Sequence, residues 1–444
     1  MIDVSNEVAL ALLVGGLLIA ILLGYPLIFS LGGIALIVGL IGWGPTVPRV
    51  LYMALWGTLR EFTFLAVPLF VFMGTMVQQS GMAERLFGTL HVLMGRFRGG
   101  LAIATIFTGT LLAAGVGVVT ASVVILGLIA LPAMVSRGYD KGIATGSICA
   151  GGTLGILIPP SIMLVLYGPT AGISVGWLFM AAVVPGLVLS AFYMTYVGVR
   201  CAVSPQLAPD LPESEDRYSP VQKIQMLLTS VIPPLMLILV VLGSIFFGVA
   251  TPTEAAAVGA AASVFMALAY RRLNWKVFVS TLHETLRVAS LVYGIAIGAS
   301  MFTRIFLGLG GGGMIVDLLT ALPFGQWGAF VGIMLLVFFL GMFIDWIGII
   351  FIVVPLVTPV AEALGFNPVW FGMMIIINLQ MSFLTPPFCP TVFVLKGIIR
   401  PEWGIDTRQI IMGVLPFVPI VALVIILCIV FPDLILWLPG QMMR

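Results

Sequence analysis

Charged residues are scarce in this chain of 444 residues: only 8% are Asp, Glu, Lys or Arg, whereas 61% are hydrophobic. An ordinary domain in water is about one quarter charged, so this composition argues against a soluble protein. Apolar runs long enough to cross a bilayer recur along the chain, which is typical of an all-α polytopic membrane protein. The first run, residues 8–23, lacks a basic leader and a cleavage site, so we interpret it as a retained helix.

Histidine and cysteine are also rare, with two and four copies, and this limits the chemistry of the chain. The cysteines form no CxxC pair and no cluster with histidine, so they are expected to be small packing residues. His91 and His283 both fall in segments expected to be cytoplasmic, which leaves no buried nucleophile or metal set for a membrane-embedded enzyme. The net charge of +2 says nothing useful about partners, and we expect no nucleic acid among them.

What the chain does contain is an internal repeat. Pro132 precedes the pair Pro159-Pro160 by as many residues as Pro359 precedes Pro386-Pro387, and "RGYD" (137–140) aligns with "LGFN" (364–367). We therefore predict two repeats, residues 1–202 and 223–444, joined by a polar cytoplasmic linker at 203–222. The spans expected in the first repeat are 7–24, 27–44, 62–80, 142–168 and 173–201, and those in the second are 224–248, 252–271, 288–310, 368–397 and 409–437.

Two apolar stretches, 99–135 and 327–362, are too long for one crossing. Each has small or polar residues near its centre, "AAGVGVV" (113–119) and "GMFIDWIG" (341–348), so we predict re-entrant hairpins. Each repeat then crosses the bilayer five times, and the odd number makes the repeats inverted. Semi-polar stretches at 49–62 and 275–288 are expected to form amphipathic interfacial helices.

The distribution of basic residues predicts the orientation. Most Lys and Arg residues fall in segments that are cytoplasmic if the N-terminus lies outside, and only Arg49, Arg60 and Arg444 fall in outside segments. We therefore expect both termini on the outer side of the membrane.

Two expected spans contain features that break helices. "NLQMSFLTPPF" (378–388) and "GGTLGILIPPS" (151–161) carry paired prolines at matching places, and proline removes a hydrogen bond and clashes with the preceding turn. Alternatively, the paired prolines only kink helices that stay continuous and packed. Because unpaired backbone groups in hydrocarbon cost several kcal/mol each, a true break requires protein, water or a ligand to satisfy them.

Two breaks and two hairpin tips related by inversion are expected to meet near the midplane and to form the site of an ion-coupled secondary transporter. The oxygens suit a hard monovalent cation, and we predict Na⁺ as the coupling ion. The candidate ion ligands are Gly151, Gly152, Asp345, Asn378, Gln380 and Ser382. The candidate substrate-binding residues are Gly115, Gly117, Thr153, Ser161, Arg304 and Thr385.

Three charged residues allow more than one interpretation. Asp345 could neutralise Na⁺, carry a proton or cap the second arm of its hairpin. Arg304 could meet an anionic substrate, although a structural pair with a carboxylate such as Asp317 is favoured. Glu254 is expected to complete a capping box with Thr251 and to have no role in chemistry.

The motifs "VPLFVFMG", "GGTLGILIPPSIMLVLYG", "GVATPTEAAAVGA", "GMFIDWIG" and "NLQMSFLTPPF" resemble the large membrane subunit of tripartite ATP-independent periplasmic transporters. The resemblance covers nearly the whole chain. It implies a Na⁺-driven elevator that imports organic anions, with a periplasmic substrate-binding protein and a small four-helix membrane subunit as partners. One departure is "AGVG" (114–117), where many members of this family have a Ser-Gly-Ser-like tip.

Two other functions remain open at this point. A single-component carrier of dicarboxylates driven by Na⁺ or H⁺, or an ion antiporter, could share the two-hairpin plan. A purely structural membrane subunit would have no use for matched broken helices.

Overall fold

The computed structural model describes residues 5–94, 97–209, 218–387 and 389–442, and the regular elements of these segments are all helical. Eight of these helices are long and apolar enough to cross a membrane, or nine if one bent pair counts as a single span. The all-α polytopic fold predicted from composition is therefore confirmed.

The helices of the first half follow the expected order. They are α1 (Asn6–Leu22), α2 (Leu27–Trp43), α3 (Val47–Leu59), α4 (Ala66–Gln79), α5 (Met82–Met94), α6 (Gly100–Val116), α7 (Val119–Ser136), α8 (Lys141–Thr153), α9 (Ile162–Ala171) and α10 (Val175–Val203). Helices α6 and α7 form the predicted hairpin, and Gly117 reverses the chain with φ +63°. The helix α5 was not predicted as a separate element.

The second half repeats this order with local differences. Its helices are α11 (Pro220–Ser230), α12 (Ile232–Phe246), α13 (Pro252–Ala269), α14 (Trp275–Gly308), α15 (Gly311–Thr320), α16 (Gly325–Gly341), α17 (Trp346–Ile352), α18 (Val354–Ala363), α19 (Pro368–Leu384), α20 (Pro390–Lys396), α21 (Thr407–Val414), α22 (Val418–Val430) and α23 (Asp433–Gly440). Helix α16 is the first arm of the second hairpin, and α17 and α18 form its second arm with a bend of 51° between them. Pro355 follows this bend, and its missing amide hydrogen explains the break.

Three predicted boundaries are wrong. The interfacial stretch 275–288 is not a separate helix, because α14 continues through it for 34 residues without an internal proline. The linker is shorter than expected, since α11 begins at Pro220 behind a capping box of Ser219 and Gln222, while its residues 210–217 lie outside the described part. The last span ends at Val430, before Pro432, and α23 follows separately.

Helix starts agree with the local sequence. Thr251 accepts a hydrogen bond from the Glu254 amide, and a Glu254 carboxylate oxygen accepts from the Thr251 amide at 2.8 Å. The predicted capping box is confirmed. Asp140 caps α8 by accepting from the Ile143 amide at 3.0 Å.

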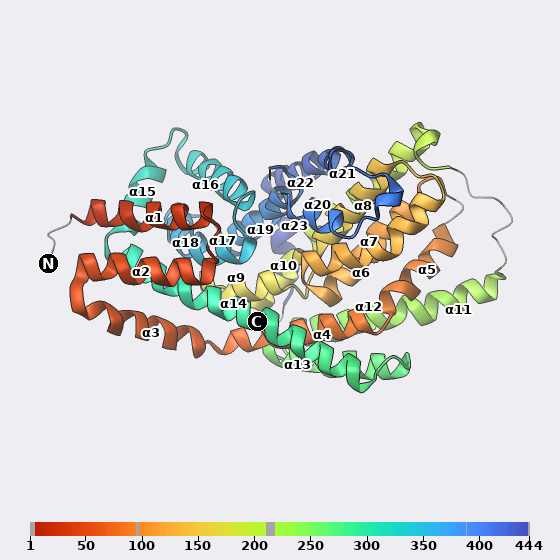
Figure 1. The fold of residues 1–444 in the computed structure, drawn as a ribbon, viewed down its shortest axis with the longest axis horizontal. Helices are drawn as coiled ribbons and strands as arrows, with labels where there is room; N and C mark the ends of the chain where they lie inside the picture. Colours follow the sequence, from red (N-terminus) through yellow and green to blue (C-terminus); the bar gives the residue numbers. More distant parts are fainter. Residues whose placement is uncertain (1–4, 95–96, 210–217, 388, 443–444) are drawn as a thin grey trace.

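The packing of the two halves is reciprocal. Helix α2 packs against α14, and α13, at the corresponding place of the second half, packs against α4. In the same way α7 packs against α20, and α17 and α18 pack against α9. Figure 1 shows α1 to α3 gathered at one end, α5 and α11 at the other, and the hairpins and broken helices lying together beside the long α14.

Candidate functional site

The first broken helix stops where proline and glycine interrupt the backbone. Helix α8 ends at Thr153, a short 3-10 turn covers Leu154–Ile156, and α9 starts only after Pro159-Pro160. The Ser161 hydroxyl donates to the Ile156 carbonyl at 2.6 Å, so it satisfies one acceptor that the break leaves free. The Thr153 hydroxyl donates to the Ala150 carbonyl at 2.9 Å. These two candidate substrate residues therefore lie buried at the break and stabilise its backbone.

The glycines before the break allow α8 to approach both arms of the first hairpin. A Cβ atom on Gly152 would lie 3.2 Å from the backbone N and Cα atoms of Val123 in α7. A Cβ atom on Gly151 would lie 3.3 Å from Cα of Ile106 in α6. Both glycines thus have a packing role here, which the sequence interpretation as ion ligands did not include. Their carbonyls as Na⁺ ligands stay a prediction.

The tip of the first hairpin lies against the same break. A Cβ atom on Gly117 would lie 3.3 Å from Cγ1 of Ile162, the first residue of α9. Gly115 faces α4, where a Cβ atom would lie 3.1 Å from Cγ1 of Val77. The structure therefore brings Gly117 to the break, whereas Gly115 contacts a neighbouring span.

Ser122 is a candidate that the sequence interpretation missed. It lies in the first turn of α7, and a Cβ atom on Gly155 in the break would lie 3.2 Å from its Oγ atom. Within the described residues this hydroxyl is buried and has no hydrogen-bond partner. A buried hydroxyl without a partner is costly and points to a ligand or water. Its signal in the sequence was a serine near the start of a mostly apolar helix arm, one turn after the glycine tip.

The second hairpin is tied to the second broken helix by side chains of α19. The Asn378 Nδ2 atom donates to the Met334 carbonyl at 2.7 Å, and the Ser382 hydroxyl donates to the Phe338 carbonyl at 3.1 Å. Both acceptors lie in α16. A Cβ atom on Gly341 would lie 2.7 Å from Ser382 Oγ, so the end of α16 also meets this region.

At the second break, as at the first, side-chain hydroxyls donate hydrogen bonds to nearby backbone carbonyls. Helix α19 ends at Leu384, just before the paired prolines, and the Thr385 hydroxyl donates to the Met381 carbonyl at 2.7 Å. Thr391, which the sequence interpretation did not include, donates to the Phe383 carbonyl at 3.0 Å. Gln380 differs from these residues, because both atoms of its buried amide have no partner within the described chain. Gln380 is thus the polar side chain of this break that is free to hold a ligand.

The two charged candidates lie at a hairpin tip and in a cavity beside α14. Asp345 is exposed at the tip of the second hairpin and caps α17 by accepting from the Ile347 amide at 3.4 Å. Arg304 is exposed and lines a cavity of about 550 Å³ together with Glu61 and Ser300. In the part of the chain that the structure describes, Arg304 forms no hydrogen bond or ion pair. The structural pair with a carboxylate such as Asp317 is thus not seen for Arg304 among the described residues.

The polar groups at the two breaks are neutral. Among the described residues, no three His, Cys, Asp or Glu side chains gather as a possible metal group. Hydroxyls, amides and backbone carbonyls at the two breaks remain, and such ligands suit hard cations.

A family model described as "Tripartite ATP-independent periplasmic transporter, DctM component" matches residues 14–434. The chain belongs to this DctM family. The C4-dicarboxylate TRAP transporter large permease protein DctM of Pseudomonas aeruginosa is 31% identical over 399 residues, which cover 90% of this chain and 91% of that protein. The sialic acid large permease SiaM of Vibrio cholerae is 32% identical and covers 86% and 87% of the two chains. The 2,3-diketo-L-gulonate large permease YiaN of Escherichia coli is 29% identical, with 85% and 86% covered.

A solved structure also resembles this member of the DctM family. The YdaH transporter of Alcanivorax borkumensis matches with a TM-score of 0.62, covering 88% of this chain and 89% of that one. At 16% sequence identity this likeness supports the fold alone.

Proposed function

We propose that this large permease imports a small organic acid together with Na⁺ across the bacterial inner membrane by an elevator mechanism. The observation that carries the proposal is the meeting of hairpins with broken helices. Gly117 lies against the start of α9, α19 is bonded to α16, and each second arm packs against the broken helix of the other half. Irregular backbone at this depth is tolerated where it lines a ligand site.

Na⁺ coupling is supported by the free oxygen atoms at the breaks. Carbonyls at the ends of discontinuous helices coordinate Na⁺ in secondary transporters. The Ser122 hydroxyl at the first break and the Gln380 amide oxygen at the second break are buried and unpartnered in the described chain. We assign these two atoms to the ion sites. The predicted ligands Asn378 and Ser382 position the second hairpin, and Gly151, Gly152 and Asp345 stay candidates.

An organic acid is supported by the relatives and by Arg304. The relatives are named for C4-dicarboxylates, sialic acid and 2,3-diketo-L-gulonate, all of which are acids. The cavity at Arg304 joins α3 and α14 to Pro169 in α9 and to Phe351 in the second hairpin. We propose that Arg304 attracts the carboxylate there before the breaks receive it. Thr153, Ser161, Thr385, Gly115 and Gly117 would then shape the pocket rather than bind by charge.

The elevator and the partners follow from membership of the DctM family. We infer that residues 1–202 and 223–444 are inverted repeats, because their packing is reciprocal. The hairpins and broken helices would move as one unit against a frame made of α1, α2, α12, α13 and the interfacial stretches. A small four-helix subunit and a periplasmic binding protein would complete the transporter, with both termini of this chain on the periplasmic side.

Uptake into proteoliposomes tests the proposal. The permease, its small subunit and the acid-loaded binding protein are combined, and a Na⁺ gradient or a proton gradient is applied separately. We expect uptake with the Na⁺ gradient and no uptake without the binding protein. Uptake driven by protons alone would contradict Na⁺ coupling, and uptake without the binding protein would identify a single-component carrier.

A further inference from the structure

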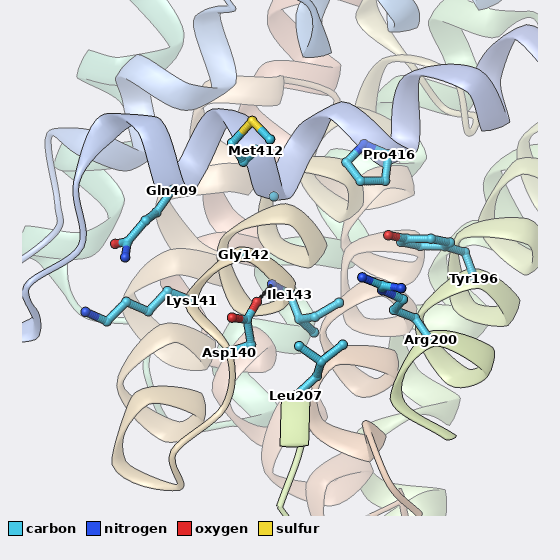
Figure 2. Close-up of a pocket in the computed structure, with 11 residues that line it drawn as sticks. Asp140, Lys141, Gly142, Ile143, Tyr196, Arg200, Leu207, Gln409, Met412 and Pro416 are labelled. Atoms are coloured by element: carbon cyan, nitrogen blue, oxygen red, sulfur yellow. Dashed lines mark hydrogen bonds between the residues drawn. The ribbon is translucent and has the colours of Figure 1, made fainter. Parts of the chain in front are cut away.

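A polar pocket lies apart from the breaks, between the end of α10 and the starts of α8 and α21. Its volume is about 280 Å³. Figure 2 shows Arg200 and Tyr196 pointing into it from α10, with Asp140 and Lys141 on the opposite side and Gln409 above them. The pocket thus contains two cations and one carboxylate.

The charges in this pocket are only partly used by the protein. Within the described segments, the Arg200 guanidinium makes no hydrogen bond and no ion pair. Lys141 donates to the Gly404 carbonyl at 2.7 Å, which holds its ammonium group at the pocket edge. Asp140 accepts one hydrogen bond, from the Ile143 amide, through Oδ1. The Arg200 guanidinium and the second oxygen of Asp140 remain available to a ligand.

The rim of the pocket is suited to lipid. Both Val175–Val203 and Thr407–Val430 are apolar enough to span a membrane, and the pocket lies where these helices begin or end. The exposed Met412 (59%) lines the pocket, and the exposed Val199 (57%) and Val203 (75%) lie next to Arg200 in the sequence at the end of α10. A lipid can therefore place its acyl chains along the helices while its headgroup enters the pocket.

We propose that this pocket binds a phospholipid headgroup that carries a phosphate and a primary ammonium group. The phosphate would accept hydrogen bonds from Arg200 and Tyr196, because a guanidinium pairs with phosphate in a planar, two-pronged geometry. The ammonium group would donate to Asp140. Basic pockets between helices at the membrane surface are typical sites for lipid headgroups.

The Asp140 carboxylate determines which lipid headgroup the pocket prefers. Asp140 repels a headgroup that carries only negative charge and attracts one with an accessible ammonium group. A quaternary ammonium group presents no N–H donor, so it cannot replace the hydrogen bond to Asp140. The pocket should therefore prefer phosphatidylethanolamine to phosphatidylglycerol and to phosphatidylcholine.

Native mass spectrometry of the full-length, delipidated permease tests this. The three lipids, with identical acyl chains, are titrated against the wild type, Arg200→Gln, Asp140→Asn and Arg408→Gln. Arg408 is the matched control, because it is an exposed arginine in α21 that does not line the pocket. Asparagine also caps helices, so Asp140→Asn preserves the start of α8.

We expect the wild type and Arg408→Gln to bind phosphatidylethanolamine most tightly. Arg200→Gln should bind about tenfold more weakly, the loss of one charge-assisted contact. Asp140→Asn should keep phosphatidylglycerol binding and lose the preference for phosphatidylethanolamine. Unchanged binding in Arg200→Gln, with a melting temperature like that of the wild type, would overturn the proposal. A second result would also overturn it. If inorganic phosphate displaces the lipid as effectively as soluble phosphoethanolamine does, the pocket is a general anion site.

Discussion

The side-chain amide of Asn378 donates a hydrogen bond of 2.7 Å to the carbonyl of Met334, 44 residues earlier in the chain. This bond ties the middle of α19 to the first arm of the second hairpin, and Ser382 repeats it one turn later on Phe338. The hairpin is thus anchored to the helix whose break lies just beyond. The paired prolines fix where α19 ends, and these two bonds hold the end of that helix against the hairpin.

Asn378→Ala should lower both stability and uptake. The substitution removes the hydrogen bond between α19 and α16, whose net contribution to stability is about 0.5–1.5 kcal/mol. We expect a lower melting temperature and weak Na⁺-driven uptake in proteoliposomes. Thr195→Ala is the control, because that exposed hydroxyl donates only within its own helix. Wild-type stability in Asn378→Ala would contradict an anchoring role.

Gly152→Ala should disrupt the packing of α8 on the first hairpin. The new Cβ atom would lie 3.2 Å from the backbone of Val123, and overpacking of this kind costs about 1–3 kcal/mol. Gly15→Ala in α1 is the control, because nothing lies within 4 Å of its Cβ position. Alanine is there the better helix former, so the control should melt at the same or a higher temperature. Equal melting temperatures for both variants would refute the close contact.

Ser122→Ala should affect the ion and spare the fold. The Ser122 hydroxyl has no protein partner in the described chain, so its removal breaks no hydrogen bond. We expect a wild-type melting temperature and a higher Na⁺ concentration for half-maximal uptake.

Thr110→Ala is the control for Ser122→Ala, because it should change the stability and not the Na⁺ dependence. Its hydroxyl lies 2.6 Å from that of Ser190 and is buried, so its loss should lower stability and leave the Na⁺ dependence unchanged. If Ser122→Ala leaves the Na⁺ dependence unchanged as well, the first ion site does not include this residue.

Arg304→Gln should weaken capture of the acid. We expect KM for uptake to rise about tenfold, as the loss of one charge-assisted contact predicts. Arg60→Gln removes the same charge beside the cavity, where the Arg60 side chain instead lies over Trp56 at 4.9 Å. Its KM should stay near that of the wild type. Equal effects of both substitutions would indicate general electrostatics rather than a contact with substrate.

A link between Leu27 and Gly348 should arrest transport. A Cβ atom on Gly348 in the second hairpin would lie 3.1 Å from Leu27 Cδ1 in α2, so Leu27→Cys with Gly348→Cys joins the proposed moving unit to the frame. Uptake should stop when a bifunctional thiol reagent joins the pair and resume after reduction. The four native cysteines are buried, which limits background reaction.

The control pair for this link lies within the frame. A Cβ atom on Gly16 in α1 would lie 3.4 Å from Ile34 Cγ2 in α2, so Gly16→Cys with Ile34→Cys joins two helices that should not move apart. This pair should transport in both states. Undiminished uptake with the Leu27–Gly348 link closed would exclude a sliding unit.

The hairpins and breaks were predictable because they depend on local rules. Prolines remove backbone donors wherever they occur, so Pro159 and Pro386 identified both breaks without knowledge of the packing. The length of an apolar stretch relative to the bilayer identified both hairpins. The start of α14 was less predictable, because no proline or glycine pattern decides whether the interfacial stretch 275–288 continues into the following span.

The roles of the site residues were less predictable, since they depend on contacts distant in the sequence. Asn378 and Ser382 looked like free polar groups, yet both donate to α16. Ser122 looked like an ordinary helix residue, and only its position beside Gly155 shows it to be an unpartnered hydroxyl at the break. A sequence shows which residues are polar but not which hydrogen bonds are already taken.

The crossed packing of the two halves has a consequence for energy coupling. Helix α7 packs against α20, and α17 and α18 pack against α9. A movement of the hairpin arm in one half would therefore displace the broken helix of the other half. An empty ion site would hold its neighbour in a poor geometry, and a filled one would improve it. If the proposed Na⁺ coupling holds, such cooperativity would suppress slippage, the passage of ions without substrate.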